Sequence, residues 1–237
     1  MKPLDFDASL AQLLEGLADE NSPLRAALLY RLSEPLPEDM AALKERWPLI
    51  PVERRRLLLS RMAEASETNF DLDFTTVALF ALDDEDEEVR CHAIDALWAA
   101  EDPAVPRRLV KMLQLDESAE VRAAAAEALG RFVLEGELGR LSPALTELVE
   151  SALLEIWFDE SDTFEVRRRA LESIAYSSRD EVPSLIQEAA DHYDLKMQAS
   201  ALFAMGRHCD KRWAPYIASA LNHAEPEMRF EAARAAG

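Results

Sequence analysis

Cysteine and glycine are both scarce in this sequence. The two cysteines, Cys91 and Cys209, lie far apart and belong to no CxxC or Cys/His pattern. This excludes a disulfide framework and gives no support to a structural zinc site. Only six glycines are present, and none forms a phosphate-binding loop or a GxSxG nucleophile elbow. We therefore expect neither nucleotide-dependent nor serine-hydrolase chemistry.

Positive charge is also scarce. The chain has 26 Lys and Arg residues against 46 Asp and Glu residues, so its formal charge is −20, and its isoelectric point is near 4.6. Such a surface repels phosphate backbones and lacks the basic patch that nucleic-acid binding requires. We expect no nucleic-acid partner, and a protein partner of basic character is favoured.

Long hydrophobic runs are missing. No apolar stretch approaches the roughly 18 residues of a membrane span, and residues 1–7 carry acids where a secretory signal would have an apolar core. The sequence thus predicts a cytoplasmic protein without a membrane segment.

Histidine is sparse and scattered, which bears on metal chemistry. The four histidines are His92, His192, His208 and His223, and no His-x-x-x-His spacing occurs. Because metal-dependent enzymes concentrate such ligands, we expect no metal, no cofactor and no catalytic residues. The sequence accordingly predicts a protein that is not an enzyme.

A recurring motif is what the sequence does contain. A turn bearing an acid is followed by an apolar residue, an arginine, and then Ala and Leu at helical spacing, as in the stretch 84–97. The arginine, or its equivalent, occupies seven positions separated by 30, 35, 32, 45, 31 and 31 residues: Arg25, Arg55, Arg90, Arg122, Arg167, Gln198 and Arg229. This spacing predicts seven helix pairs, divergent over 1–72 and regular over 73–237.

Two local features are expected at the edges of this pattern. The first helix starts near Leu10, with Asp7 available as its N-cap. The 45-residue step contains Gly136 and Gly139, which favour an extended loop before a longer helix from about Pro143 to Phe158.

The repeated residues have structural reasons. In the second helix of each pair, the apolar residue before the arginine and the residues three and seven positions after it share one face, so Ala125 is expected to be buried. An Asp stands six residues before the arginine in Asp19/Arg25, Asp84/Arg90 and Asp116/Arg122. It can accept the guanidinium or the N–H groups of the helix that follows. We expect a structural ladder, continued by Arg167 and Arg229, in which Arg122→Ala lowers stability and leaves binding unchanged.

The alternation of apolar-Pro-x-x-Leu helices with Asp-turn-Val-Arg-x-x-Ala-x-x-Ala-Leu-Gly helices resembles HEAT-like repeats of the phycobilisome-lyase type. The resemblance covers the chain, most clearly from about Phe74 onward. It implies an all-α, right-handed solenoid formed by a single array over 1–237, with the second helices on its concave face. It also implies a non-enzymatic scaffold that binds a protein or peptide.

A competing interpretation is an enzyme-associated or metal-dependent HEAT-like protein, either lyase-like or hydroxylase-like. Enzymes resembling deoxyhypusine hydroxylase carry His-Glu dipeptides on several repeats, and none occurs here. Elemental analysis of the purified protein distinguishes the two interpretations.

The concave face is the candidate binding surface. Positions +1, +5, +8 and +9 after the arginine lie opposite the packing side, and His92 adds an off-motif residue nearby. These positions select Tyr30, Trp98, Tyr176, Phe203 and Phe230 together with Asp95, Glu127 and Glu172. Aromatic residues there favour recognition of a partner, and packing against the next repeat is the equal alternative. We expect an extended or basic segment to bind along an acidic groove.

Two further stretches allow alternatives. The six acids from Asp83 to Glu88 suggest a cation or docking site, but they lack the spaced ligands of an EF-hand, so an inter-helix turn is favoured. The last helix, from Met228, has no polar helix after it. We expect either a longer array or self-association through this end, which light scattering distinguishes.

Overall fold

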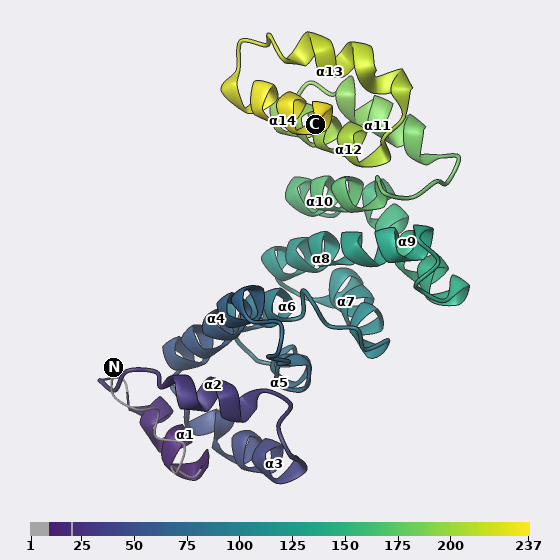
Figure 1. The fold of residues 1–237 in the computed structure, drawn as a ribbon. Helices are drawn as coiled ribbons and strands as arrows, with labels where there is room; N and C mark the ends of the chain where they lie inside the picture. The colour runs from purple at the N-terminus through teal and green to yellow at the C-terminus, as the bar shows by residue number, and fades with distance from the viewer. Residues whose placement is uncertain (1–9, 20) are drawn as a thin grey trace. The chain divides into compact units, whose positions relative to one another are not determined.

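The computed structural model describes residues 10–19 and 21–237, and this part of the chain is helical throughout (Figure 1). None of its helices is both long and apolar enough to cross a membrane. Fourteen α-helices and two short 3-10 helices follow one another in the described residues. They are α1 (Leu10–Ala18), α2 (Ala26–Leu32), α3 (Pro37–Arg46), η1 (Trp47–Leu49), α4 (Val52–Thr68), α5 (Thr75–Ala81), α6 (Glu87–Ala96), α7 (Ala104–Leu115), α8 (Ala119–Glu137), α9 (Pro143–Phe158), α10 (Phe164–Ile174), α11 (Val182–Ala190), α12 (Leu195–His208), η2 (Lys211–Trp213), α13 (Ala214–Ala220) and α14 (Pro226–Ala236).

The helices form two compact units, residues 1–105 and residues 106–237. In the first unit, α4 and α5 both pack on α6, and α1 contacts α2 and α3. In the second unit, α8, α10, α12 and α14 stack in that order, and α9, α11 and α13 each pack beside the helix that follows. The prediction of an all-α fold made of repeated helix pairs is confirmed.

Four of the second helices, α6, α8, α10 and α12, begin where the turn supplies a capping oxygen. The side chains of Asp86, Ser118 and Thr163 each accept a hydrogen bond from the backbone N–H of the valine three residues later, and Asp194 accepts from the N–H of Lys196. Such caps satisfy backbone donors that have no partner inside the helix. The cap predicted at Asp7 lies outside the described residues.

The core consists of the motif residues that share a face. The positions −1, +3 and +7 around Arg90, Arg122 and Arg167 are at most 2% exposed. They are Val89, Ala93 and Leu97; Val121, Ala125 and Leu129; and Val166, Ala170 and Ile174. Burial of an alanine at +3 in each repeat lets adjacent helices approach closely.

The prediction of an extended loop in the 45-residue step is wrong. The helix α8 runs through Gly136 to Glu137, and α9 follows after a short connection. A Cβ at Gly136 would lie 2.4 Å from Cγ2 of Thr146 on α9, so this glycine allows two helices to touch. Gly139, at φ +67°, ends α8, with the N–H groups of Gly139 and Arg140 bonded to the carbonyls of Gly136 and Glu135.

Candidate partner-binding site

A groove of about 580 Å³ crosses the four second helices of the second unit, α8, α10, α12 and α14. Every residue in its wall comes from one of these helices, except Tyr176, which directly follows the C-cap of α10. The wall consists of Glu127, Gly130, Arg131, Leu134, Arg168, Arg169, Glu172, Ser173, Tyr176, Phe203, Arg207, Glu227, Glu231 and Arg234. We call this site the arginine groove.

Helical periodicity explains which side chains enter the arginine groove. Counting from the anchor position of each repeat, position +5 supplies Glu127, Glu172, Phe203 and Arg234. Position +9, one turn further along the same face, supplies Arg131, Tyr176 and Arg207. Because positions four apart lie on one side of a helix, the repeats present a continuous row of side chains across the stack.

Two glycines at position +8 bring the backbones of the groove helices together. A Cβ at Gly130 would lie 2.9 Å from Oγ of Ser173, and a Cβ at Gly206 would lie 2.7 Å from Cα of Ala235. A side chain at Gly206 would require a shift of α14, and a side chain at Gly130 would require the Ser173 side chain to move. The close approach places the +5 and +9 side chains of adjacent helices within contact distance of each other.

The wall of the arginine groove carries both charges in nearly equal number. Its wall contains five arginines and four glutamates, so 5 − 4 leaves one formal positive charge. The net charge of −20 describes the whole chain. The sequence prediction, which selects aromatic and acidic residues, omits the arginines that lie on the same face.

Glu172 belongs to a buried network and is not open to a partner. Its carboxylate accepts a hydrogen bond from the hydroxyl of Ser200 and pairs with Arg169 at 3.0 Å and Arg168 at 3.6 Å. Arg168 also donates to the Ser200 hydroxyl and to Glu165. The network joins α10 to α12, so Glu172 stabilises the floor of the groove.

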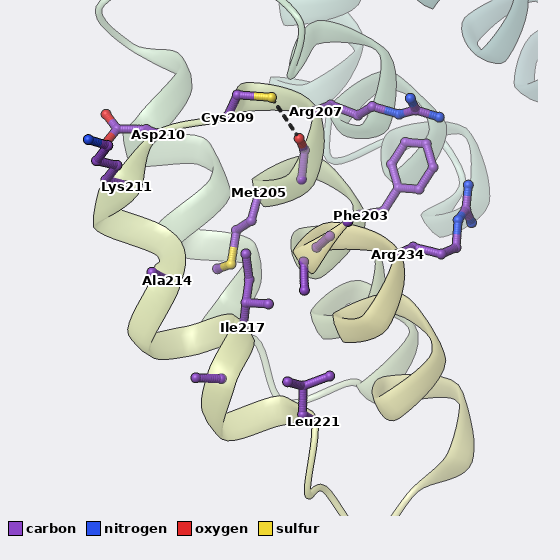
Figure 2. Close-up of a pocket in the computed structure, with 15 residues that line it drawn as sticks. Phe203, Met205, Arg207, Cys209, Asp210, Lys211, Ala214, Ile217, Leu221 and Arg234 are labelled. Carbon is purple, nitrogen blue, oxygen red and sulfur yellow. Dashed lines mark hydrogen bonds between the residues drawn. The ribbon is translucent and has the colours of Figure 1, made fainter.

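Arg207 and Arg234 lie against aromatic rings at the α12 and α14 end of the groove. The guanidinium carbon of Arg207 is 5.2 Å from the ring centroid of Tyr176 and 4.8 Å from that of Phe203. Arg234 lies 4.8 Å from the centroid of Phe203 and 5.6 Å from that of Phe230. Figure 2 shows Arg207 and Arg234 flanking the Phe203 ring. Cation–π contacts of this kind hold an arginine in place and leave its N–H donors available.

The structure brings four of the predicted residues into one site: Glu127, Glu172, Tyr176 and Phe203. Sequence reasoning missed Arg131, Arg169, Arg207 and Arg234. The signal was present, since Arg131 and Arg207 occupy position +9 and Arg234 position +5, both of which lie on the projected face. The sequence prediction includes only the aromatic and acidic side chains of that face.

The other predicted residues lie in the first unit, apart from Phe230 on α14, which is 60% exposed. Trp98 is 39% exposed, donates its Nε1–H to the hydroxyl of Ser66 at 2.8 Å, and lies 6.1 Å from the exposed ring of Phe70. On α6, Nδ1 of His92 lies 3.6 Å from Oδ2 of Asp95. Tyr30 is exposed on α2.

The ladder arginines bind turn carbonyls more than carboxylates. Arg90, Arg122 and Arg229 each donate to the carbonyls six and five residues earlier. The Asp at −6 accepts the N–H two residues later, as Asp84 does from Asp86 and Asp116 from Ser118. Each arginine therefore closes the turn that precedes its own helix.

Asp19 and Arg25 do not form this arrangement, and in the described residues no hydrogen bond or ion pair joins them. Arg25 is the N-cap of α2 in extended conformation, whereas the other anchor residues lie four residues into their helices, where the side chain can fold back over the turn. Arg167 differs too, since it donates to the carbonyl of Trp157 at 3.0 Å and packs on that ring.

Bonds between repeats come from arginines that reach the turn of the next repeat. Arg55 donates to the buried carboxylate of Asp84 at 2.6 Å. Arg122 binds both carboxylate oxygens of Asp162 at 3.1 and 2.7 Å. The single charge-assisted bond of Arg55 and the two parallel bonds of Arg122 fix the geometry of the neighbouring turn.

The acidic run 83–88 is held by these internal contacts. Arg56 donates to both oxygens of Asp86 at 2.9 and 2.6 Å and pairs with Glu88 at 2.9 Å. The hydrogen bonds from Arg56 lower the pKa of Asp86 to about 2. The run therefore forms the turn before α6 and the first residues of that helix, and its carboxylates neutralise Arg55 and Arg56 of α4.

The histidines take part in helix turns and packing. His192 and His223 stand at the −6 position, where Nδ1 accepts the N–H two residues later at 3.0 and 3.1 Å. His208 packs edge-on against Trp213, and burial lowers the pKa of its imidazole. No group of three or more His, Cys, Asp or Glu residues suited to a metal ion occurs in the described ranges.

A second cavity, of about 730 Å³, lies between α12, α13 and α14 (Figure 2). Met205, Ile217 and Leu221 line its apolar part, and the Cys209 thiol at its rim lies 3.1 Å from the carbonyl of Gly206. Its wall also includes Gly237.

The chain is similar to known proteins in its repeats and in its fold. Residues 76–175 match the family model of HEAT repeats. No curated protein matches the chain. Among solved structures, a chain from the structure of Kap95p binding to RanGDP is 17% identical, with a TM-score of 0.52. The match covers 98% of this chain and 29% of that one.

Two engineered proteins are similar over nearly their whole length. An engineered protein solved by the Northeast Structural Genomics Consortium is 20% identical with a TM-score of 0.50, covering 96% of this chain and 97% of that one. A designed armadillo repeat protein in complex with the peptide (KR)4 is 20% identical with a TM-score of 0.47, covering 97% and 98%. The chain therefore has the fold of paired repeat helices, and over residues 76–175 it is similar to HEAT repeats.

Proposed function

We propose that the protein is a non-enzymatic scaffold that binds a segment of another protein in the arginine groove. The observation that carries this proposal is a groove across four successive second helices in which Phe203 and Tyr176 are partly exposed beside arginines. Aromatic residues and arginine are enriched in protein interfaces, because they combine a large contact area with directional polar groups.

The dimensions of the groove favour an extended segment. Packed helices lie roughly 8–10 Å apart, so the three steps from α8 to α14 span on the order of 27 Å. An extended chain covers about 3.3–3.6 Å per residue, which corresponds to roughly eight residues. A folded domain would need a wider surface, whereas a strand-like segment lies along the row of +5 and +9 side chains.

We propose no acidic binding groove, because the wall of the arginine groove has a slight positive excess. The net charge of −20 still favours a partner whose remaining surface is basic, since attraction at long range speeds association. A role like that of phycobilisome lyases rests on the analogy of fold alone, so we propose a scaffold instead.

The test is an affinity pull-down from an extract of the source organism with the full chain as bait. We expect Phe203→Ala to lose the captured partner, because the ring supports both groove arginines. Tyr193→Ala is the matched control, since Tyr193 is 90% exposed and lies outside the groove. Trp98→Ala tests the first unit in the same way. Equal capture by Phe203→Ala and wild type contradicts binding in the arginine groove.

A metal-dependent enzyme is the competing class. Elemental analysis of the purified full chain is expected to show less than one equivalent of iron, zinc or manganese. A stoichiometric metal that survives dialysis against a chelator would contradict a non-enzymatic scaffold.

A further inference from the structure

Arg207 differs from the other arginines of the arginine groove in its partners. Arg131 pairs with Glu135, Arg168 and Arg169 pair with Glu165 and Glu172, and Arg234 pairs with Glu231. Among the described residues, Arg207 has aromatic rings within contact distance but no carboxylate within ion-pairing distance. Its side chain is exposed at the end of α12.

Arg207 lies close to a second guanidinium. Arg207 and Arg234 each lie 4.8 Å from the same Phe203 centroid, so two positive charges share one ring. Glu231 neutralises Arg234 at 3.0 Å and has 15% of its side chain exposed, which leaves it little room to serve Arg207 as well. The chain has 20 excess negative charges. Even so, no carboxylate of the described residues pairs with Arg207, whose guanidinium is held by two aromatic rings.

We infer that Arg207 is an anchor for a carboxylate side chain, Asp or Glu, in the extended segment of a partner protein. This inference rests on the proposed function and names the chemistry that the groove selects. The planar guanidinium presents parallel N–H donors that match both oxygens of a carboxylate. Tyr176 and Phe203 fix the plane of the fork before binding, so little side-chain entropy is lost on binding.

Charge complementarity selects this occupant over a cationic one. A lysine or arginine of the partner at this point would face Arg207 and Arg234 together. A partner carboxylate instead supplies the missing counter-ion and relieves the repulsion across the Phe203 ring. A segment with an acid at one position and basic residues toward Glu127 and Glu227 at the exposed rim fits the charges of the groove wall.

The experiment uses an array of random ten-residue peptides, acetylated and amidated at their ends. Each is synthesised in three versions that differ at one central residue, Glu, Gln or Lys. Binding of the labelled full chain is expected to favour the Glu version by about tenfold, since a hydrogen bond to a charged group contributes at least that factor. In Arg207→Ala this preference is expected to disappear, and Arg207→Lys, which keeps the charge without the fork, is expected to restore only part of it.

Arg140→Ala is the matched control, because Arg140 is an exposed arginine of the same unit that lies outside the groove. It is expected to keep the full preference, and thermal melting checks that each variant is folded. Equal binding of the Glu and Gln versions, preference for Lys, or a preference that persists in Arg207→Ala overturns the inference.

The two proposals fail in different ways. Peptides whose binding is lost in Phe203→Ala but which show no preference for Glu overturn the carboxylate anchor and leave the scaffold proposal standing. Peptides that bind equally well to Phe203→Ala and wild type overturn both.

Discussion

Asp84 has no exposed side-chain surface, and donors from three parts of the first unit converge on its carboxylate. Arg55 and Trp47 both donate to Oδ2 at 2.6 Å, and the N–H of Asp86 donates to Oδ1 at 2.9 Å. Its carbonyl accepts from Arg90 at 2.9 Å. A single residue thus joins α4, η1 and the start of α6.

Replacing Asp84 with Asn is expected to lower the free energy of unfolding of the first unit by about 3 kcal/mol. The substitution keeps the shape but leaves the buried guanidinium of Arg55 with only the exposed carboxylate of Glu85, at 3.4 Å, as a counter-ion. Urea denaturation followed by circular dichroism measures the change. Glu85→Gln, at a side chain that is 85% exposed, is the control and is expected to change stability by less than about 0.5 kcal/mol. Equal effects would show that Arg55 does not depend on Asp84.

Asp86 provides a pH-dependent contribution at the same turn. Its pKa is lowered from 3.8 to about 2 in the folded protein, first by the hydrogen bonds from Arg56. Because the unfolded chain takes up this proton at a higher pH, the contribution is complete above about pH 4 and is lost as pH falls toward 2. We expect the stability difference between wild type and Asp86→Asn to shrink over this range, as measured by urea denaturation at several pH values. Asn keeps the helix cap, so a difference that is constant with pH would contradict the role of the charge.

At the scale of helices, the sequence predicted elements wherever local chemistry determines them. The helix α9 has the bounds expected from its Ser-Pro start, and Arg90, Arg122, Arg167 and Arg229 all fall at the fourth helical residue. Gly136 was misread because glycine usually weakens a helix, whereas here contact with Thr146 on the next helix requires it. Arg207 and Tyr176 both occupy position +9, one repeat apart, so their proximity follows from the repeat register. The cation–π contact between them was not predictable, because it depends on side-chain rotamers that no sequence pattern specifies.

The contact between α12 and α14 is expected to depend on Gly206. A Cβ at this position would lie 2.7 Å from the backbone of Ala235, so Gly206→Ala is expected to destabilise α14 by roughly 1–3 kcal/mol. Hydrogen exchange of the α14 amides measures the loss of protection.

Gly16→Ala is the matched control, because Gly16 lies inside α1 with nothing within 4 Å of the added Cβ. It is expected to be neutral or to stabilise α1 by up to about 1 kcal/mol through helix propensity. If both substitutions stabilise the protein, the close approach at Gly206 is not a constraint.

At the scale of the whole chain, stability is expected to be distributed locally. In repeat proteins each repeat contributes its own stability and an interaction with its neighbours, so a perturbation decays along the array. We expect Asp84→Asn to accelerate hydrogen exchange in α4 and α6 while α12 and α14 keep their protection. A uniform loss of protection would indicate that all 237 residues unfold as one cooperative unit.

The bonds from Arg55 to Asp84 and from Arg122 to Asp162 also limit how this chain can evolve or be engineered. Each pair has its donor in one repeat and its acceptor in the next, so each repeat depends on particular residues of its neighbour. Deleting the repeat of Asp162 would place Arg122 opposite the turn in which Tyr193 takes the position of Asp162, so the acid it needs would be missing. Deleting the repeat of Asp84 would place Arg55 opposite Asp116, which stands at the same position of its turn. Recombination of repeats is therefore tolerated only when the junction keeps a donor next to its acceptor. The order of the repeats consequently matters for stability.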